Sequence, residues 1–137
     1  MKANNLLSMA KLGQPKIRAL SIILVSVAFA VLGQLFLKSG MTKIGALNVS
    51  DIFSPRIFSV ITNSSIIIGL LLYMLASGLW IVALSQEEVS VVYPLIALGY
   101  VVTAVLAKFV FAENLSLFRM AGILLIVAGA YLIILKI

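Results

Sequence analysis

The chain has 137 residues, of which 64% are hydrophobic and 10% are charged, and its formal net charge is +6. An ordinary soluble domain is about 45–50% apolar and about 25% charged. This composition excludes a water-soluble globular domain and indicates an integral membrane protein. Cysteine and histidine are both absent, which excludes disulfides, thiol chemistry and the commonest transition-metal sites. We therefore expect no metal and no cofactor.

Uncharged stretches mark the first two predicted membrane spans. The 19 uncharged residues from Ala19 to Leu37 would extend about 28 Å as a helix, close to the thickness of the hydrocarbon core. They predict a span over 19–38. Polar residues around Asn63 interrupt the next uncharged run, and such residues favour helix caps over helix interiors. The second span is therefore predicted over 64–85.

Two further spans are predicted after short connections. The third covers 89–111, with Pro94 in its first turns and Lys108 in its last, and the fourth covers 117–135. Short connections make consecutive helices antiparallel neighbours. The sequence thus predicts an all-α membrane protein with four transmembrane helices in an antiparallel bundle, forming one domain over 19–137.

Two segments lie outside these spans. The N-terminal tail, 1–18, holds four basic residues and no acidic residue, which is typical of a topogenic segment or of a segment resting on anionic lipid. The connection over 40–61 is the long one, and its part 51–58 is predicted to form a short interfacial helix or turn.

The distribution of lysine and arginine predicts the orientation of the chain in the membrane. The side that holds both termini carries five basic residues, and the opposite side also carries five. Discounting Lys38 and Lys108, which lie at span ends, leaves five against three and favours cytoplasmic termini. The near balance leaves dual insertion open as an alternative.

Polar residues inside the spans are candidate binding residues, because hydrocarbon penalises them. Gln34 and Lys38 are four residues apart and share a helix face, where they would suit a phosphate or another anion. In the alternative interpretation Gln34 bonds a neighbouring helix and Lys38 reaches to the interface. Tyr93 precedes Pro94, which removes a backbone donor and is tolerated beside a cavity. The alternative for Tyr93 is a place in the interfacial aromatic belt.

Other residues have structural interpretations. Glu113 precedes the fourth span, where a carboxylate favours the positive end of a helix, so we expect it to cap that helix. Trp80 is interpreted as a packing or belt residue. Gly122 and Gly129 are two helical turns apart and share a face on which another backbone can approach closely. This face predicts a dimer interface, and packing within one subunit is the alternative.

Several motifs together resemble the drug/metabolite transporter superfamily, and within it the four-helix small multidrug resistance branch and its EamA-type relatives. The resemblance covers about residues 19–135. Its motifs are Gly33, Gln34, Leu35, Phe36, Leu37 and Lys38, then Val91, Val92, Tyr93, Pro94 and Leu95, then Phe111, Ala112, Glu113 and Asn114, and finally Gly122, Leu124, Leu125, Ile126 and Gly129.

The resemblance implies a transporter of the bacterial inner membrane and not an enzyme. Quaternary-ammonium exporters of this superfamily use a glutamate at the position of Ala30, so proton-coupled cation export lacks its central residue here. The subunits that flip undecaprenyl-phosphate-linked aminoarabinose are more similar in pattern. A lipid-linked substrate would then be held by Gln34, Lys38, Tyr93 and Pro94.

The same resemblance implies the partners. We expect a homodimer, or a heterodimer with a related four-helix subunit, embedded in membrane lipids, and no nucleic-acid partner. A small multidrug or metabolite exporter is the alternative function. A scaffold for an enzyme complex is a third hypothesis.

Overall fold

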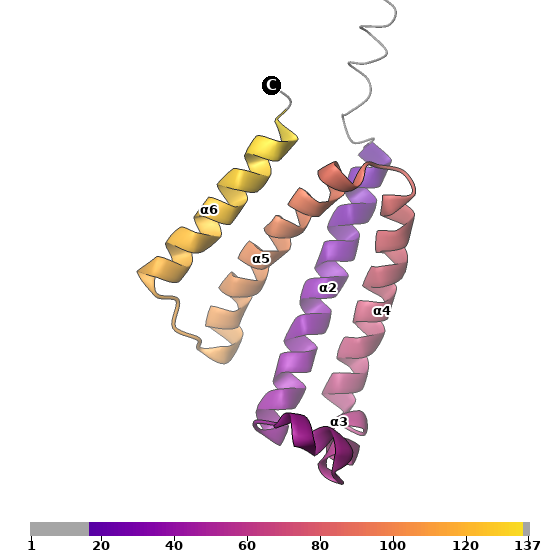
Figure 1. Ribbon diagram of the computed structural model, residues 1–137, viewed down its shortest axis with the longest axis vertical. Helices are drawn as coiled ribbons and strands as arrows, with labels where there is room; N and C mark the ends of the chain where they lie inside the picture. The colour runs from indigo at the N-terminus through magenta and orange to yellow at the C-terminus, as the bar shows by residue number, and fades with distance from the viewer. Residues whose placement is uncertain (1–16, 136–137) are drawn as a thin grey trace, which may run out of the picture.

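The computed structural model describes residues 17–135, and within them every regular element is helical. The all-helical class expected from the sequence is thus confirmed. Three of the helices, α2, α4 and α5, are long and apolar enough to cross a membrane, and α6 contains a shorter apolar stretch. The elements in chain order are α2 (Ile17–Ile44), the 3-10 helix η1 (Val49–Phe53), α3 (Arg56–Ile61), α4 (Ser64–Leu84), α5 (Val89–Phe111) and α6 (Leu117–Ile134) (Figure 1).

Side-chain caps set where α4 and α6 begin. Asn63 Oδ1 accepts hydrogen bonds from the backbone N–H groups of Ser65 at 3.0 Å and Ile66 at 3.3 Å. Ser116 Oγ accepts one from the N–H of Arg119 at 3.3 Å. These bonds satisfy N–H groups that a helix start leaves without partners. The expectation that Glu113 caps the last helix was wrong, because Ser116 is the N-cap residue.

Helix α2 is longer than the span predicted over 19–38, because it continues to Ile44. A charged residue marks where the hydrocarbon ends and does not stop the helix, since Lys38 can extend its ammonium group into the headgroup layer. At about 1.5 Å per residue the 28 residues of α2 reach roughly 42 Å. The chain leaves the helix at Gly45, whose φ is +89°. Most of the predicted tail, 1–18, lies outside the described residues.

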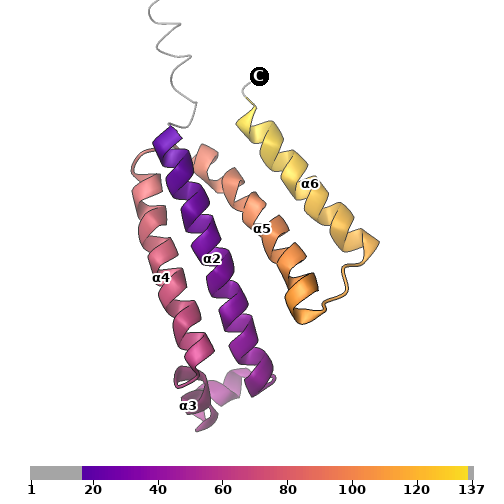
Figure 2. The ribbon, with the colours of Figure 1, turned by 180° about the vertical axis from the view of Figure 1, so that it is seen from behind.

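The four long helices lie side by side in the order α4, α2, α5, α6 (Figures 1 and 2). Helices that follow each other in the chain run in opposite directions, so the neighbours α2 and α5 run in the same direction. Helices α2 and α4 pack along most of their length, whereas α5 leans against α2 and barely meets α4. Within the described range α6 packs against α5 and contacts neither α2 nor α4. The arrangement is therefore an open row, with one face of α6 uncovered.

Two glycines allow the close packing of α2 and α4. A Cβ atom placed on Gly33 would lie 2.9 Å from the carbonyl oxygen of Gly69, and one on Gly69 would lie 2.9 Å from that of Gly33. Small residues at such a crossing let two backbones approach directly. Two turns further along both helices, the buried Ser26 hydroxyl donates a 2.8 Å hydrogen bond to the carbonyl of Ala76. These contacts hold α2 and α4 together as one unit.

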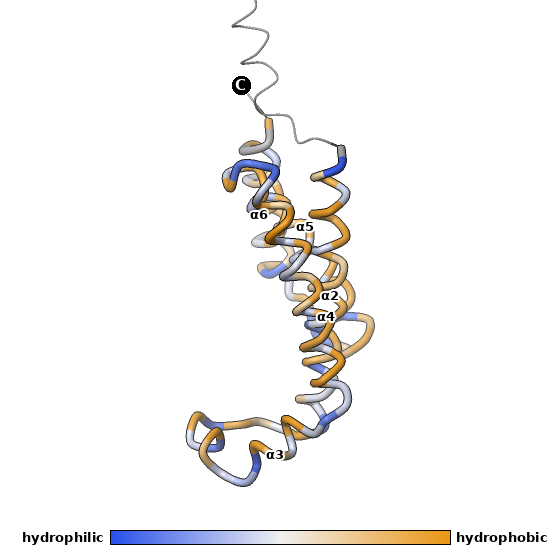
Figure 3. Tube along the Cα trace, turned by 90° about the vertical axis from the view of Figure 1, so that its right-hand side faces the viewer, coloured by the Kyte–Doolittle hydropathy of each residue, from blue (hydrophilic) through white to orange (hydrophobic). Residues whose placement is uncertain are grey.

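The connection between α2 and α4 projects to one side of the helices (Figure 3). It contains η1 and α3, so the segment predicted over 51–58 as a short helix or turn is largely helical. Its large apolar side chains are exposed, with Phe53 at 92% of its maximum. In a membrane protein, lipid covers such side chains.

We expect Gly69→Ala to destabilise the fold, because the added methyl group would press on the backbone of α2. Overpacking of this kind costs roughly 1–3 kcal/mol, and thermal unfolding of the detergent-solubilised protein would measure it as a lower Tm. Gly78→Ala is the matched control on the same helix, since nothing lies within 4 Å of a Cβ placed there. Equal Tm values for the two variants would contradict this account of the packing.

Candidate functional site: a groove between α2, α4 and α5

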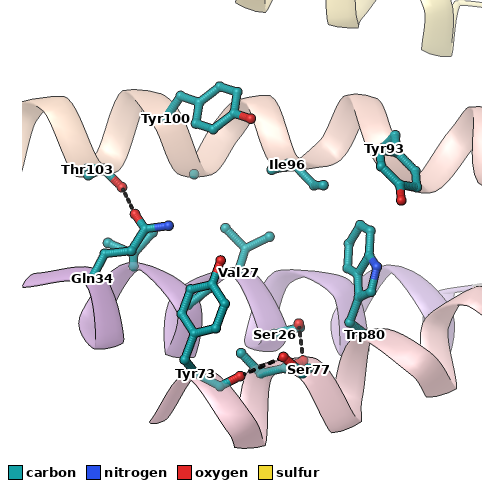
Figure 4. A pocket seen from close by; sticks show the side chains of 14 residues that line it. Ser26, Val27, Gln34, Tyr73, Ser77, Trp80, Tyr93, Ile96, Tyr100 and Thr103 are labelled. Atoms are coloured by element: carbon teal, nitrogen blue, oxygen red, sulfur yellow. Dashed lines mark hydrogen bonds between the residues drawn. The ribbon is translucent and has the colours of Figure 1, made fainter. Parts of the chain in front are cut away.

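A half-open groove of about 230 Å³ lies where α5 diverges from α4. Each of the three helices α2, α4 and α5 supplies part of its wall (Figure 4). The lining residues are Ser26, Val27, Ala30, Val31 and Gln34 from α2, Tyr73, Ala76, Ser77 and Trp80 from α4, and Tyr93, Ile96, Gly99, Tyr100 and Thr103 from α5.

Aromatic side chains form much of the wall. Tyr73 and Trp80 come from α4, and Tyr93 and Tyr100 come from α5. The rings of Trp80 and Tyr93 meet edge to face, with centroids 5.6 Å apart and an interplanar angle of 78°. Such rings offer flat apolar faces for stacking together with polar tips for hydrogen bonds.

Uncharged polar groups complete the lining. The Thr103 hydroxyl donates a 3.3 Å hydrogen bond to Gln34 Oε1, which links α5 to α2. Ser77 donates to the carbonyl of Tyr73 at 2.8 Å. Among the residues that line the groove none is charged, so it offers no general acid or base of the carboxylate type. Across residues 17–135 no group of three or more metal-ligating side chains comes together.

The structure brings two of the predicted binding residues into the groove. Gln34 and Tyr93 both line it, whereas Lys38 and Pro94 do not. Lys38 lies one helical turn beyond Gln34, and its ammonium group pairs with the carboxylate of Glu113 at 3.3 Å. Both side chains of this pair are partly exposed, at 55% and 37%. Pro94 sits inside α5 without breaking it.

The turn after α5 brings Glu113 toward Lys38. Ala112 ends α5 in the left-handed conformation, with φ at +52° and ψ at +33°, a conformation that is common at helix C-termini. The ion pair of Lys38 and Glu113 thus joins the loop between α5 and α6 to α2. The bond between Gln34 and Thr103, within the groove lining, also ties α5 to α2.

Sequence reasoning missed most of the aromatic wall. Trp80 was interpreted as a packing or belt residue, and Tyr73, Tyr100 and Thr103 were not singled out. One signal could have found them, because Tyr73 and Trp80 are seven residues apart and so are Tyr93 and Tyr100. A spacing of two turns places each pair on one helix face. Two such aromatic faces on consecutive spans indicate a shared cavity.

Membrane-capable helices around an uncharged, partly open groove define a helical membrane protein with a cavity open to a ligand. Transporters belong to this class. The chain belongs to the EamA-like transporter family, whose family model matches residues 52–135.

Curated relatives are similar over different shares of the chain. The probable 4-amino-4-deoxy-L-arabinose-phosphoundecaprenol flippase subunit ArnF of Proteus mirabilis is 33% identical over 118 residues, covering 82% of this chain and 85% of that protein. The subunit of the same name from Shewanella sediminis is 30% identical over 133 residues, covering 88% and 90%.

A second group of relatives matches a shorter region. The probable flippase subunit ArnE of Pseudomonas fluorescens is 38% identical over 66 residues, covering 47% of this chain and 58% of that protein. The chain thus spans less than two thirds of the ArnE relatives that it matches. No solved structure gave a significant match.

The Lys38 and Glu113 contact can be tested by cross-linking, because the chain has no native cysteine. We expect a Lys38→Cys, Glu113→Cys variant in membranes to be joined by a short bismaleimide, since the two native side-chain tips are in contact. Mass spectrometry of the digested protein would detect the linked peptides. A Lys38→Cys, Ser85→Cys pair is the control, because Ser85 follows α4 at the far end of the antiparallel pair. Linkage of the control alone would refute the arrangement.

Proposed function

We propose that the chain is one subunit of a flippase that moves an undecaprenyl-phosphate-linked amino sugar across the bacterial inner membrane. The observation that carries this proposal is the groove of uncharged polar and aromatic side chains between membrane-capable helices. Two curated relatives that cover most of the chain bear the name of such a flippase subunit. The chain acts by transport and is not an enzyme.

In this proposal α2, α4, α5 and α6 are four transmembrane helices in antiparallel order. Even numbers of spans place both termini on one side, and the excess of basic residues in the N-terminal tail favours the cytoplasm. The η1 and α3 segment then lies at the opposite surface.

The sugar occupies the groove, and the prenyl tail remains in lipid. Sugar rings have apolar faces that can stack on Trp80 and Tyr93, while Gln34 offers an amide to their hydroxyl groups. An amino group on the sugar gains further from the aromatic faces through cation–π attraction. Because the groove is only half enclosed, a tail attached to the sugar can leave it sideways. No covalent bond needs to break.

Lys38 lies outside the groove and binds the phosphate group of the lipid. A lipid phosphate arriving beside Gln34 competes with Glu113 for the ammonium group of Lys38, because both are anions that accept charge-assisted hydrogen bonds. Exchange of partners loosens the link between α2 and the α5–α6 connection. Rocking of α5 and α6 against α2 and α4 then exposes the sugar to the other leaflet.

A second subunit packs on the open face of α6. Nothing in the described chain lies within 4 Å of a Cβ placed on Gly122 or on Gly129, so these glycines serve no contact inside the subunit. They suit the backbone of another helix. The partner is a second copy or a related four-helix subunit.

Export of small cationic or metabolite molecules is the second candidate function. The aromatic wall favours it, because rings also bind organic cations. Ala30, at the position of the exporters' glutamate, disfavours it, since no carboxylate lines the groove.

The fluorescence of Trp80 tests the substrate directly, because it is the only tryptophan of the chain. We expect undecaprenyl-phosphate-linked aminoarabinose to change the emission of the purified protein in detergent. Gln34→Ala removes a hydrogen-bonding group and should weaken binding by roughly tenfold, as expected for about 1.5 kcal/mol. Gln86→Ala, outside the groove, should leave it unchanged. A response to tetraphenylphosphonium with none to the lipid would favour the exporter instead.

Native mass spectrometry tests the α6 interface. We expect Gly122→Leu, Gly129→Leu to convert dimers into monomers, both for the chain alone and after coexpression with a related subunit, because two leucines would hold the partner backbone away. Gly78→Leu is the control, since its Cβ also points into open space but on α4. Dimers that persist in the double variant would place the interface elsewhere.

A further inference from the structure

A second, polar pocket lies at the end of the molecule opposite residues 17 and 135. It is formed where the last turn of α2 meets α3 and the start of α4, and its volume is about 530 Å³. The lining residues are Lys43, Ile44, Arg56, Ser59, Thr62 and Asn63. It shares no lining residue with the groove between α2, α4 and α5.

The pocket carries positive charge and free hydrogen-bond donors. Within the described residues the Lys43 ammonium group, the Ser59 hydroxyl and the side-chain NH₂ of Asn63 have no partner. No acidic residue lines the pocket. A surface of donors and cations without a carboxylate in its wall favours an anion with several acceptor oxygens.

Arg56 is held in place at the rim of this pocket. Its guanidinium group contacts Asp51 Oδ2 at 3.1 Å and the carbonyl of Ala46 at 3.4 Å. The same Asp51 oxygen accepts the N–H of Asn48 at 2.8 Å, and the Asp51 side chain is only 16% exposed. Two of the five N–H donors of an arginine are thus used for positioning, and the others remain for a ligand.

Exposed apolar side chains lie on α3, which supplies part of the pocket wall, and on η1, which precedes α3 in the chain. The segment projects sideways from the helices (Figure 3), and acyl chains can cover it. Its exposed large apolar residues are Val49, Ile52, Phe53, Phe58 and Ile61. Because α2 is longer than the hydrocarbon core is thick, we expect its last turn, with Lys43, to lie at the depth of lipid headgroups.

We propose that this pocket binds the phosphate group of an anionic membrane lipid, with the acyl or prenyl chains of that lipid lying against η1 and α3. Lys43 and Arg56 neutralise the phosphate, and Ser59 and Asn63 donate hydrogen bonds to its oxygens. The site is separate from the groove and does not depend on the proposed transport function. It gives the segment between α2 and α4 a fixed attachment to the membrane surface.

Lipid retention in native mass spectrometry tests this proposal on the full chain in detergent. Wild-type protein should retain phosphatidylglycerol in preference to phosphatidylcholine, whose headgroup has no net charge. Lys43→Gln should weaken phosphatidylglycerol retention about fivefold, the effect expected for one basic residue at a membrane surface. Lys108→Gln is the matched control, because it removes the same charge outside the pocket and should change retention less than twofold.

A neutral substitution separates the pocket from general charge attraction. Ser59→Leu replaces a hydrogen-bond donor of the pocket by a larger apolar side chain without altering charge. It leaves the Arg56 and Asp51 pair intact, so it should lower phosphatidylglycerol retention as Lys43→Gln does. Equal losses in the Lys43 and Lys108 variants, or unchanged retention in the Ser59 variant, would refute the site. Displacement of the lipid by millimolar inorganic phosphate would assign the pocket to free phosphate and overturn the lipid assignment.

Discussion

The direct backbone contact between α2 and α4 at Gly33 and Gly69 determines how the other helices can be placed. In a membrane, lipid surrounds apolar side chains as well as protein does, so close packing rather than burial from water holds helices together. With a Cβ atom at either glycine the two backbones could not approach as they do. The contact, reinforced by the Ser26 hydroxyl bond to Ala76, makes these two helices a rigid wall.

The looser placement of α5 creates the groove beside this wall. At one end Trp80 and Tyr93 touch edge to face, and toward the other end Thr103 bonds Gln34. Between them α5 stands away from α4, and side chains only partly fill the gap. The exposed ion pair of Lys38 and Glu113 adds little stability by itself, so α5 and α6 can move without disrupting the wall. The proposed rocking motion requires such an arrangement, in which one helix pair is tightly packed and the other is loosely held.

Much of this fold could be predicted because membranes impose simple rules. The lack of charge and the capping side chain of Asn63 placed α4 within one residue of its observed end, and the same reasoning located α5 and α6. The end of α2 was missed because Lys38 marks the hydrocarbon edge and not the helix end. The contacts of Lys38 with Glu113 and of Gly33 with Gly69 were not predicted, because they depend on the rotation of each helix about its axis. Without knowledge of neighbours, a uniformly apolar helix gives no signal for that rotation, and so the aromatic wall was also overlooked.

Along α2 an uncharged region, which lines the groove, is followed by a basic region toward the end of the helix. The groove around Gln34 is uncharged, Lys38 lies one turn further, and Lys43 lies at the pocket near the end of the helix. Burying an unpaired phosphate in apolar surroundings would cost several kcal/mol or more, whereas a sugar can be satisfied by hydroxyl groups, an amide and aromatic faces. In the proposed function, a lipid-linked sugar therefore places its sugar inside the groove and its phosphate at the cationic edge. Under that proposal, one small subunit holds a charged lipid without a charged residue in the lining of its groove.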